Sequence, residues 1–145
     1  MPSVYIETSV VSHASARPYN DPITRALQIQ ARRWWDNERH AFDLYTSQAV
    51  IDEAPLGDPE AAAERLELLR GLPLVDISEE VRRVAAEILA HSLMPQKAAA
   101  DALHVAAAAV AGVDYLLTQN CRHITNAHTL PGVYRLLEML GVPRP

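Results

Sequence analysis

The alanine-rich stretch at residues 95–112 constrains the fold more than any other part of the chain. It begins with Pro95, whose missing N–H costs nothing in the first turn of a helix, and it ends at Gly112. Residues 113–118 follow as a short apolar run, which predicts a buried strand. Because small side chains let neighbouring elements approach the backbone closely, we expect a central helix lying on a sheet.

One carboxylate, Asp101, interrupts this helix. It is either a residue on a solvent-facing side or a buried charge, and a buried acid needs a cation, a hydrogen-bond network or a metal to compensate it. His104 lies three residues later and shares the same helix face. Such a histidine is more often a hydrogen-bonded core residue than a metal ligand.

Composition indicates one compact domain over residues 1–145, with 49% hydrophobic residues. The formal net charge of −5 argues against a protein that holds nucleic acid by bulk electrostatics alone, although a local basic patch remains compatible with it. The single cysteine, Cys121, excludes an internal disulfide and is typical of a reducing cytoplasm. No apolar run approaches the roughly 20 residues of a membrane span, so we expect a cytoplasmic protein that does not contact membranes.

Further acids follow two other predicted strands. Residues 3–6 read as a strand, and Glu7, Thr8 and Ser9 come directly after it. Open α/β sheets bind ligands beyond the carboxyl ends of their strands, so Glu7 is either a ligand-binding acid or a capping or surface acid.

A second strand is predicted at residues 42–46, and Ser47 then caps a short helix at residues 48–53. Glu53 ends this helix, with Asp52 as its rival. Because one residue turns a helical side chain by about 100°, the two acids cannot share one role.

The remaining pattern predicts helices near residues 22–38, 59–70, from 79 onward and 132–140, and a strand at 72–77. The sequence Arg-Arg-Trp-Trp at residues 32–35 is compatible with recognition of nucleic acid by basic and aromatic side chains. We favour packing instead, with Trp34 in the core and Trp35 covering an edge or a subunit interface. Cys121, His123 and His128 lack zinc-site spacing, which argues against zinc.

Four segments together resemble PIN-domain nucleases, and most closely the VapC-type toxins of bacterial toxin–antitoxin systems. They are Tyr-Ile-Glu-Thr-Ser at 5–9, Ser-x-x-Val-x-x-Glu at 47–53, Asp-Ala-Leu-His at 101–104 and Leu-Leu-Thr-Gln-Asn-Cys-Arg-His-Ile at 116–124. The resemblance covers essentially the whole chain in order and spacing. It implies an α/β fold of three layers, with a central parallel sheet flanked by helices.

The same resemblance implies a metal-dependent endoribonuclease that cleaves single-stranded or structured RNA and acts as a toxin, with a small antitoxin protein as partner and a homodimer as assembly. Glu7, Glu53 and Asp101 are then the ligands of Mg²⁺ or Mn²⁺, hard ions that prefer oxygen. Asn120 completes the catalytic set. The metal ligands or a bound water would be oriented by hydrogen bonds from Thr8, Ser9 and His123.

Two residues depart from the family pattern. Glu7 stands where the family most often has Asp, and Asn120 stands where it often has a fourth acid. An amide oxygen can ligate a metal but brings no charge, so His123 or Asn126 could contribute at that position. Two other classes of protein therefore stay open: a catalytically weakened PIN fold that binds RNA or protein, and an unrelated α/β protein with structural acids.

Overall fold

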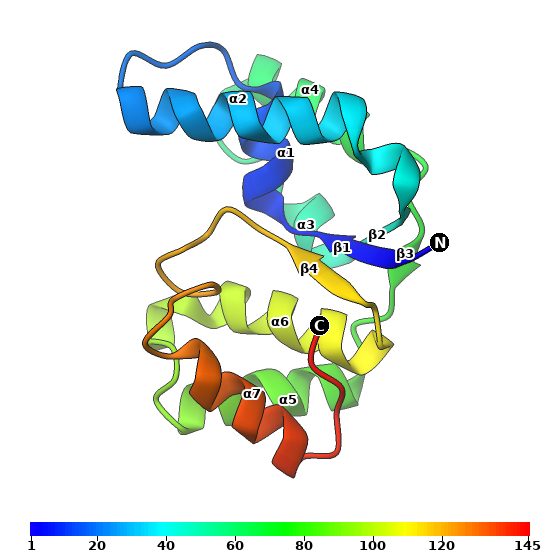
Figure 1. Ribbon diagram of the computed structural model, residues 1–145, viewed down its shortest axis with the longest axis vertical. Helices are drawn as coiled ribbons and strands as arrows, with labels where there is room; N and C mark the ends of the chain where they lie inside the picture. The colour runs from blue at the N-terminus through cyan, green and yellow to red at the C-terminus, as the bar shows by residue number, and fades with distance from the viewer.

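The computed structural model describes residues 1–145 and has three layers, with a parallel sheet between two groups of helices (Figure 1). The strand order is β3-β2-β1-β4. The strands are β1 (Ser3–Ile6), β2 (Asp43–Ser47), β3 (Leu74–Val75) and β4 (Tyr115–Leu117). In the register, Val4 of β1 pairs with Leu44 on one side and Tyr115 on the other. The α/β class, the three layers and the parallel sheet expected from the sequence are confirmed.

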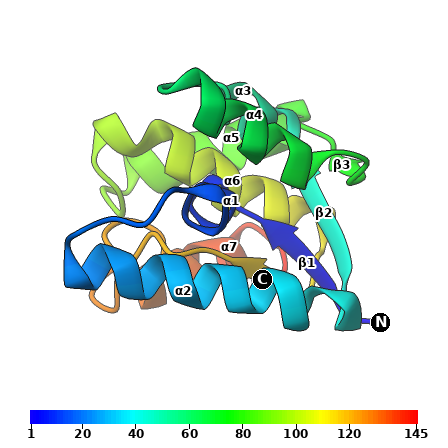
Figure 2. The same ribbon diagram turned by 90° about the horizontal axis from the view of Figure 1, so that it is seen from above.

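Helices cover both faces of this sheet (Figure 1). One group consists of α1 (Thr8–Ser15), α2 (Pro22–Asn37) and α4 (Pro59–Leu69). The other consists of α5 (Glu79–Ala90), α6 (Ala99–Ala111) and α7 (Leu130–Met139), and the short helix α3 (Gln48–Glu53) follows β2 directly. Single 3-10 turns lie at Arg39–Ala41 and Gln96–Ala98. In Figure 2, α2 crosses the molecule beside α1. None of these helices combines the length and apolar character that a membrane-spanning segment requires.

Local sequence signals explain where most helices begin and end. The Asp21 side chain accepts a hydrogen bond from Thr24 N before Pro22 opens α2, and Ser78 does the same for Val81 N at the start of α5. Gly112 ends α6 with φ 71°, a left-handed conformation that glycine adopts without strain. These helices were predicted from the same residues.

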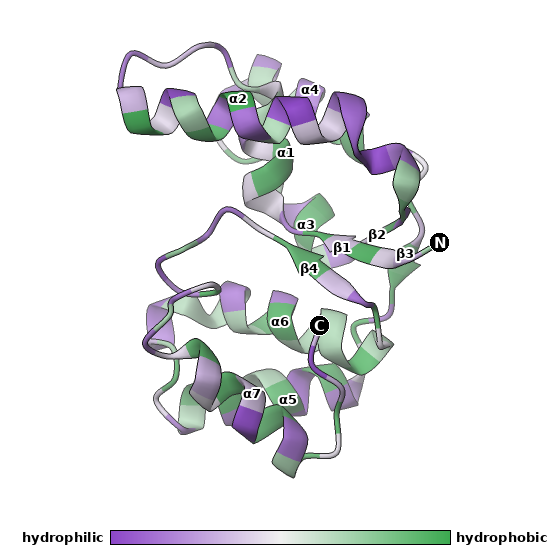
Figure 3. Cartoon of the chain, in the orientation of Figure 1, coloured by the Kyte–Doolittle hydropathy of each residue, from purple (hydrophilic) through white to green (hydrophobic).

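The central position of α6 is also confirmed. Its residues from Val105 to Ala109 are all buried, and it packs against α5 as well as the sheet. Figure 3 shows most of α6 in hydrophobic colours, whereas α2 alternates between hydrophilic and hydrophobic segments. The alanines let α6 lie close to its neighbours, and this fixes where Asp101 and His104 meet the sheet.

Two features of the N-terminal half differ from what the sequence indicates. Residues 8–15 form α1, a helix that was not predicted there, because the β-branched Val10 and Val11 are fully buried and packing overrides their weak helix propensity. The prediction for the two tryptophans was also wrong, because their positions are reversed. Trp35 is buried, while Trp34 is half-buried and stacks on Phe42 with ring centroids 5.9 Å apart.

The buried face of α2 explains this reversal. It is formed by Gln28, Ala31 and Trp35. Because Gln28 is polar, a search for hydrophobic residues at helical spacing does not detect this face. The alternative face contains Ile23, whose side chain is 74% exposed. The other elements match their predicted positions within a few residues, except that β3 and β4 are shorter than expected.

Candidate functional site

Glu7 lies at the point where β1 passes into α1. It is 3% exposed and forms the N-cap of α1, with its Oε2 accepting from the Ser9 backbone N at 3.0 Å and from Ser9 Oγ. Thr118 Oγ1, just beyond β4, donates to the same oxygen at 2.8 Å. No Lys, Arg or His side chain pairs with Glu7. Glu7 is therefore a capping residue and also a buried acid without a cationic partner.

Glu53 ends α3 and is held by two side chains. Its Oε2 accepts from Thr8 Oγ1 at 2.8 Å, and its Oε1 lies 2.8 Å from His104 Nε2. Since Thr8 follows Glu7 in the chain, this bond draws the ends of β1 and α3 together. Asp52, the rival acid, is exposed and accepts from Gln48 Nε2 at 2.9 Å. Of the two acids, Glu53 is therefore the one that contacts Thr8 and His104.

The environment of Glu53 favours its ionised form. Burial raises the pKa of this carboxyl, but the hydrogen bond from His104, the attraction to its ring and the hydroxyl of Thr8 outweigh burial and hold the pKa below its usual range. An ionised carboxylate only accepts hydrogen bonds, so His104 donates through Nε2–H.

His104 belongs to a buried polar chain that runs back into the sheet. It is fully buried, and its Nδ1 lies 2.8 Å from the Tyr5 hydroxyl, which lies 2.7 Å from Ser47 Oγ. Burial raises the pKa of Tyr5; the Ser47 hydrogen bond lowers it, and the negative charges of Glu7 and Glu53 raise it further. Tyr5 therefore keeps its proton. His104 is a core histidine, as its position in an apolar helix indicates, and it fixes the orientation of Glu53.

Asp101 lies in the first turn of α6, where its side chain is 20% exposed. His123 Nδ1 is 2.9 Å from Asp101 Oδ2, so the carboxylate is neither fully buried nor free in solvent. The backbone N of His123 donates to Asn120 Oδ1 at 3.0 Å, and the backbone N of Asn120 donates to Thr118 Oγ1 at 2.9 Å. Thr118 thus connects this loop back to Glu7.

The structure joins the predicted residues into two hydrogen-bonded chains around the carboxyl ends of the strands. One chain runs from Glu7 and Ser9 through Thr118, Asn120 and His123 to Asp101, and the other contains Glu53, Thr8, His104, Tyr5 and Ser47. The two chains of hydrogen bonds come together at two places. Glu7 and Thr8 are adjacent in sequence, and Asp101 and His104 lie three residues apart on α6. Asn126 stays outside, bonded to the Arg122 carbonyl and to His128 N.

The PIN domain model matches residues 4–127, a range that contains β2, β3 and β4, all of β1 except Ser3, and every residue of the two chains. The chain belongs to the PIN domain family. Searches of curated proteins and of solved structures found no match. PIN domains are generally metal-dependent nucleases, so this family membership supports a nuclease-type fold and a hydrolytic activity for the PIN domain described above.

The residues of this PIN domain fit a hard divalent cation by their chemistry. No three His, Cys, Asp or Glu side chains form a group arranged to hold a metal ion. However, the acids of the site offer carboxylate oxygens, which hard cations prefer, and neither Glu7 Oε1 nor Asp101 Oδ1 accepts a hydrogen bond from the protein. The buried charge of Glu7 also lacks a cation. Glu7 and Asp101 would therefore bind an ion most directly; both Glu53 oxygens already accept hydrogen bonds, so it would use its remaining lone pairs.

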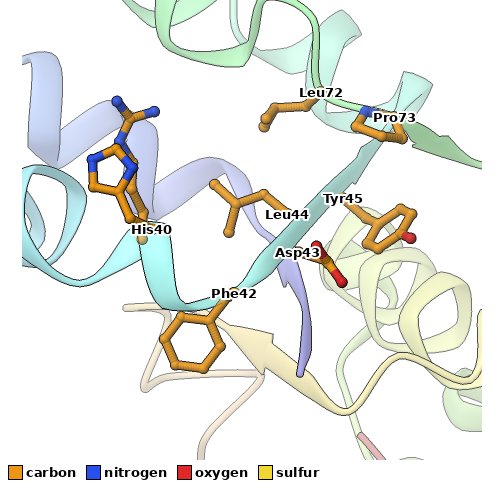
Figure 4. Close-up of a pocket in the computed structure, with 8 residues that line it drawn as sticks. His40, Phe42, Asp43, Leu44, Tyr45, Leu72 and Pro73 are labelled. Atoms are coloured by element: carbon orange, nitrogen blue, oxygen red, sulfur yellow. The ribbon is translucent and has the colours of Figure 1, made fainter. Parts of the chain in front are cut away.

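One pocket lies next to the site, and another lies apart from it. A pocket of about 470 Å³ adjoins it, with His123, Arg122, Pro95 and Leu93 among its walls. Another, of about 410 Å³, is formed by β2, the turn before it and the segment before β3 (Figure 4). Its acid, Asp43, is 3.9 Å from the N-terminal amine, and it contains no residue of the two chains. The PIN-domain site is therefore separate from the pocket in Figure 4.

Sequence reasoning missed three contributors to the site. Thr118 is a hydroxyl residue directly beyond β4, in the same position relative to its strand as Glu7 is to β1, and this parallel was the available signal. The roles of Tyr5 and Ser47 were harder to predict, because a single hydroxyl residue within a strand is also common in sheets that carry no site. The roles of Glu7, Glu53, Asp101, Asn120, Thr8, Ser9 and His123 in catalysis stay predictions.

Proposed function

We propose that this PIN-domain protein is a metal-dependent endoribonuclease that hydrolyses single-stranded or structured RNA. The supporting observation is the buried, unpaired charge of Glu7 just beyond β1. Hydrogen bonds connect it, through Thr118, Asn120 and His123, to Asp101, and the next residue, Thr8, donates to Glu53. A buried anion without a protein cation favours a bound one. The family match supports the same chemistry, because PIN domains are generally metal-dependent nucleases.

The residues divide the work as follows. Glu7 and Asp101 would hold the cation, and Glu53 is kept in a fixed orientation by Thr8 and His104. Such a divalent ion would lower the pKa of a water molecule and neutralise charge that develops on the phosphate. In the hydrolysis, the water oxygen bonds to phosphorus, the bond from phosphorus to the leaving ribose oxygen breaks, and that oxygen receives a proton that originates from the water.

Mg²⁺ and Mn²⁺ are the cations that the site favours. Both accept carboxylate and amide oxygens in incomplete protein cages and keep several waters. Asn120 supplies an oxygen without charge, and it already accepts one hydrogen bond from His123 N. This combination favours one tightly bound ion and a second one held with help from the substrate phosphate.

The biological role that we propose is that of a toxin in a VapC-type toxin–antitoxin pair. Support comes from the likeness of the four sequence segments to that group of PIN domains. A small antitoxin protein and a second copy of the chain are the expected partners. Two isoleucines of α2 offer apolar surface for such contacts, because Ile23 is 74% and Ile29 is 44% exposed.

Expression in a bacterial host tests the toxin role. We expect induction of the parent protein to arrest growth, and induction of Asp101→Asn at the same protein level to leave growth unchanged. Co-expression of the small open reading frame directly upstream in the source genome is expected to restore growth and to yield a complex on size-exclusion chromatography. Growth arrest by both proteins, or by neither, contradicts the role.

A second candidate function is a PIN fold that binds RNA without cutting it. The neutral Asn120 in place of an acid favours this alternative, as does the absence of a ready-made three-residue metal group. It predicts binding of RNA that persists in Mn²⁺ with no cleavage products. Denaturing gel electrophoresis of RNA incubated with the protein separates the two functions.

A further inference from the structure

A basic pocket lies between α1 and α2, outside the carboxylate site. It has a volume of about 340 Å³, and its charged or titratable walls are His13, Arg25, Arg32 and Arg33, without any acid among its lining residues. We call it the α1–α2 pocket. The chain as a whole has 18 acidic and 13 basic residues. A pocket with three arginines and no acid in its lining therefore has the opposite charge to the protein overall.

Two of these arginines have no carboxylate partner. Arg25 and Arg33 form no ion pair, whereas Arg17, close by in the chain, is paired with Glu60. Arg32 is bonded to Asp36 through Nε at 3.2 Å and donates through Nη1 to the Ala14 carbonyl at the end of α1, also at 3.2 Å. The pocket therefore keeps a net positive potential, which attracts anions.

The pocket is built on a fixed base. Gln28 is 3% exposed, and its amide donates to the Arg17 carbonyl at 3.0 Å and accepts from Tyr19 N at 3.1 Å. Arg25 Nη1 lies 3.4 Å from Gln28 Oε1 at the edge of this buried amide. These hydrogen bonds hold the loop before α2 against the helix. The contact with Gln28 also fixes where the Arg25 guanidinium lies.

Hydrogen bonds connect the pocket to the carboxylate site. His13 Nδ1 lies 2.6 Å from Gln119 Oε1, and the backbone N of Gln119 donates to Ser9 Oγ at 2.8 Å. Ser9 in turn binds Glu7. Helix α1 thus begins at the buried acid and places His13 six residues later, roughly 9 Å along its axis at 1.5 Å per residue.

We propose that the α1–α2 pocket binds a backbone phosphate of the RNA strand a few nucleotides from the bond that is cleaved, with Arg25 and Arg33 as its charged contacts. This inference rests on the proposed ribonuclease function. Carboxylates at the site repel the phosphates of an approaching strand, so a protein with net charge −5 needs a cationic contact nearby. Arginine suits that contact, because its guanidinium binds phosphate oxygens through two parallel hydrogen bonds.

RNA binding without catalysis tests the pocket. Fluorescence anisotropy of a short fluorescein-labelled single-stranded RNA is measured in EDTA with the parent, Arg25→Gln, Arg33→Gln and the double variant. We expect each single change to weaken binding about tenfold. Each should also reduce the slope of log Kd against log salt concentration by about 0.7, the value for one phosphate contact on a single strand.

Arg83→Gln is the matched control, because Arg83 is an exposed arginine of α5 in the other helix group and forms no ion pair. It removes the same charge and is expected to leave affinity and salt slope at parental values. Arg33 is exposed and makes no hydrogen bond, so Arg33→Gln is expected to fold normally. It therefore still tests the pocket if the Arg25 variant misfolds.

Each outcome of these measurements is decisive. Loss of affinity and slope in the pocket variants alone supports the proposal. Equal losses in Arg83→Gln, or none in the double variant, overturn it, and the ribonuclease function still stands if cleavage in Mn²⁺ depends on Asp101. Absence of RNA binding by the parent in EDTA overturns the pocket, and absence of cleavage in Mn²⁺ as well overturns the function.

Discussion

His104 Nε2 lies 2.8 Å from Glu53 Oε1, which joins a fully buried histidine of α6 to an acid at the end of α3. Behind the histidine stand Tyr5 and Ser47, from the two central strands. The orientation of Glu53 is therefore determined by the interior of the protein. A carboxylate held in this way loses little conformational freedom when it contributes to binding of a cation, which is the general advantage of supporting hydrogen bonds behind a ligand.

Tyr5→Phe is expected to destabilise the protein by about 1–3 kcal/mol. The change keeps the ring but removes the hydroxyl that serves both Ser47 and His104, and each of those is then a buried polar group with a lost partner. Urea unfolding followed by circular dichroism measures the free energy. Tyr45→Phe is the control, since Tyr45 pairs with Tyr5 in the sheet but its hydroxyl makes no hydrogen bond. Equal effects of both variants would mean that the polar chain contributes nothing to stability.

Glu7→Gln is expected to leave the free energy of unfolding in EDTA unchanged or to raise it by up to about 1 kcal/mol. The amide oxygen accepts the same hydrogen bonds from Ser9 and Thr118, while the buried charge disappears. Calorimetric titration with Mn²⁺ should show weaker binding than in the parent. Marked destabilisation in EDTA, with Mn²⁺ binding retained, would show that the carboxylate serves the helix cap rather than a cation.

The sequence predicted the fold well where local chemistry determines it. The helix starts at Asp21-Pro22 and Ser78, and the end of α6 at Gly112, follow from capping rules that act within a few residues. Helix α1 was missed because its two valines favour a strand locally, and only burial against α2 and α4 makes them helical.

The site shows the same division. Glu7, Glu53 and Asp101 each stand out as an acid beside apolar residues, and the sequence placed them on the right elements. The bonds that orient them connect residues far apart in the chain, such as Thr118 with Glu7 and His104 with Glu53. Pairings of that kind depend on strand order and helix placement, which a single sequence does not specify residue by residue.

Glu53→Gln and Asp52→Asn form a matched pair of neutralising substitutions on one short helix. Glu53→Gln places an amide where His104 and Thr8 both donate, so one of these donors meets another donor. We expect a loss of about 1–3 kcal/mol in stability and weaker Mn²⁺ binding. Asp52 is exposed, and its substitution should change neither urea midpoint nor Mn²⁺ isotherm. A metal effect of Asp52→Asn as large as that of Glu53→Gln would remove the distinction that the geometry makes.

Asn120→Asp is expected to strengthen binding of a second cation. The new carboxylate can still accept the hydrogen bond from His123 N, so the loop keeps its shape while one negative charge is added. Titration with Mn²⁺ should show one tight event in both proteins and a second event that is tighter in the variant. Cleavage should then require less metal. Identical isotherms for the two proteins would indicate that the Asn120 side chain does not contribute to the cation site.

Cleavage of a single-stranded RNA by the parent protein and by Asp101→Asn tests the central claim most directly. We predict that the parent cuts the RNA in Mg²⁺ or Mn²⁺ and is inactive in EDTA, and that Asp101→Asn, with an unchanged circular dichroism spectrum, loses at least about a hundredfold in rate. Asp52→Asn should cut at the parental rate. Parental cleavage by Asp101→Asn, or cleavage by the parent that persists in EDTA, would contradict the account.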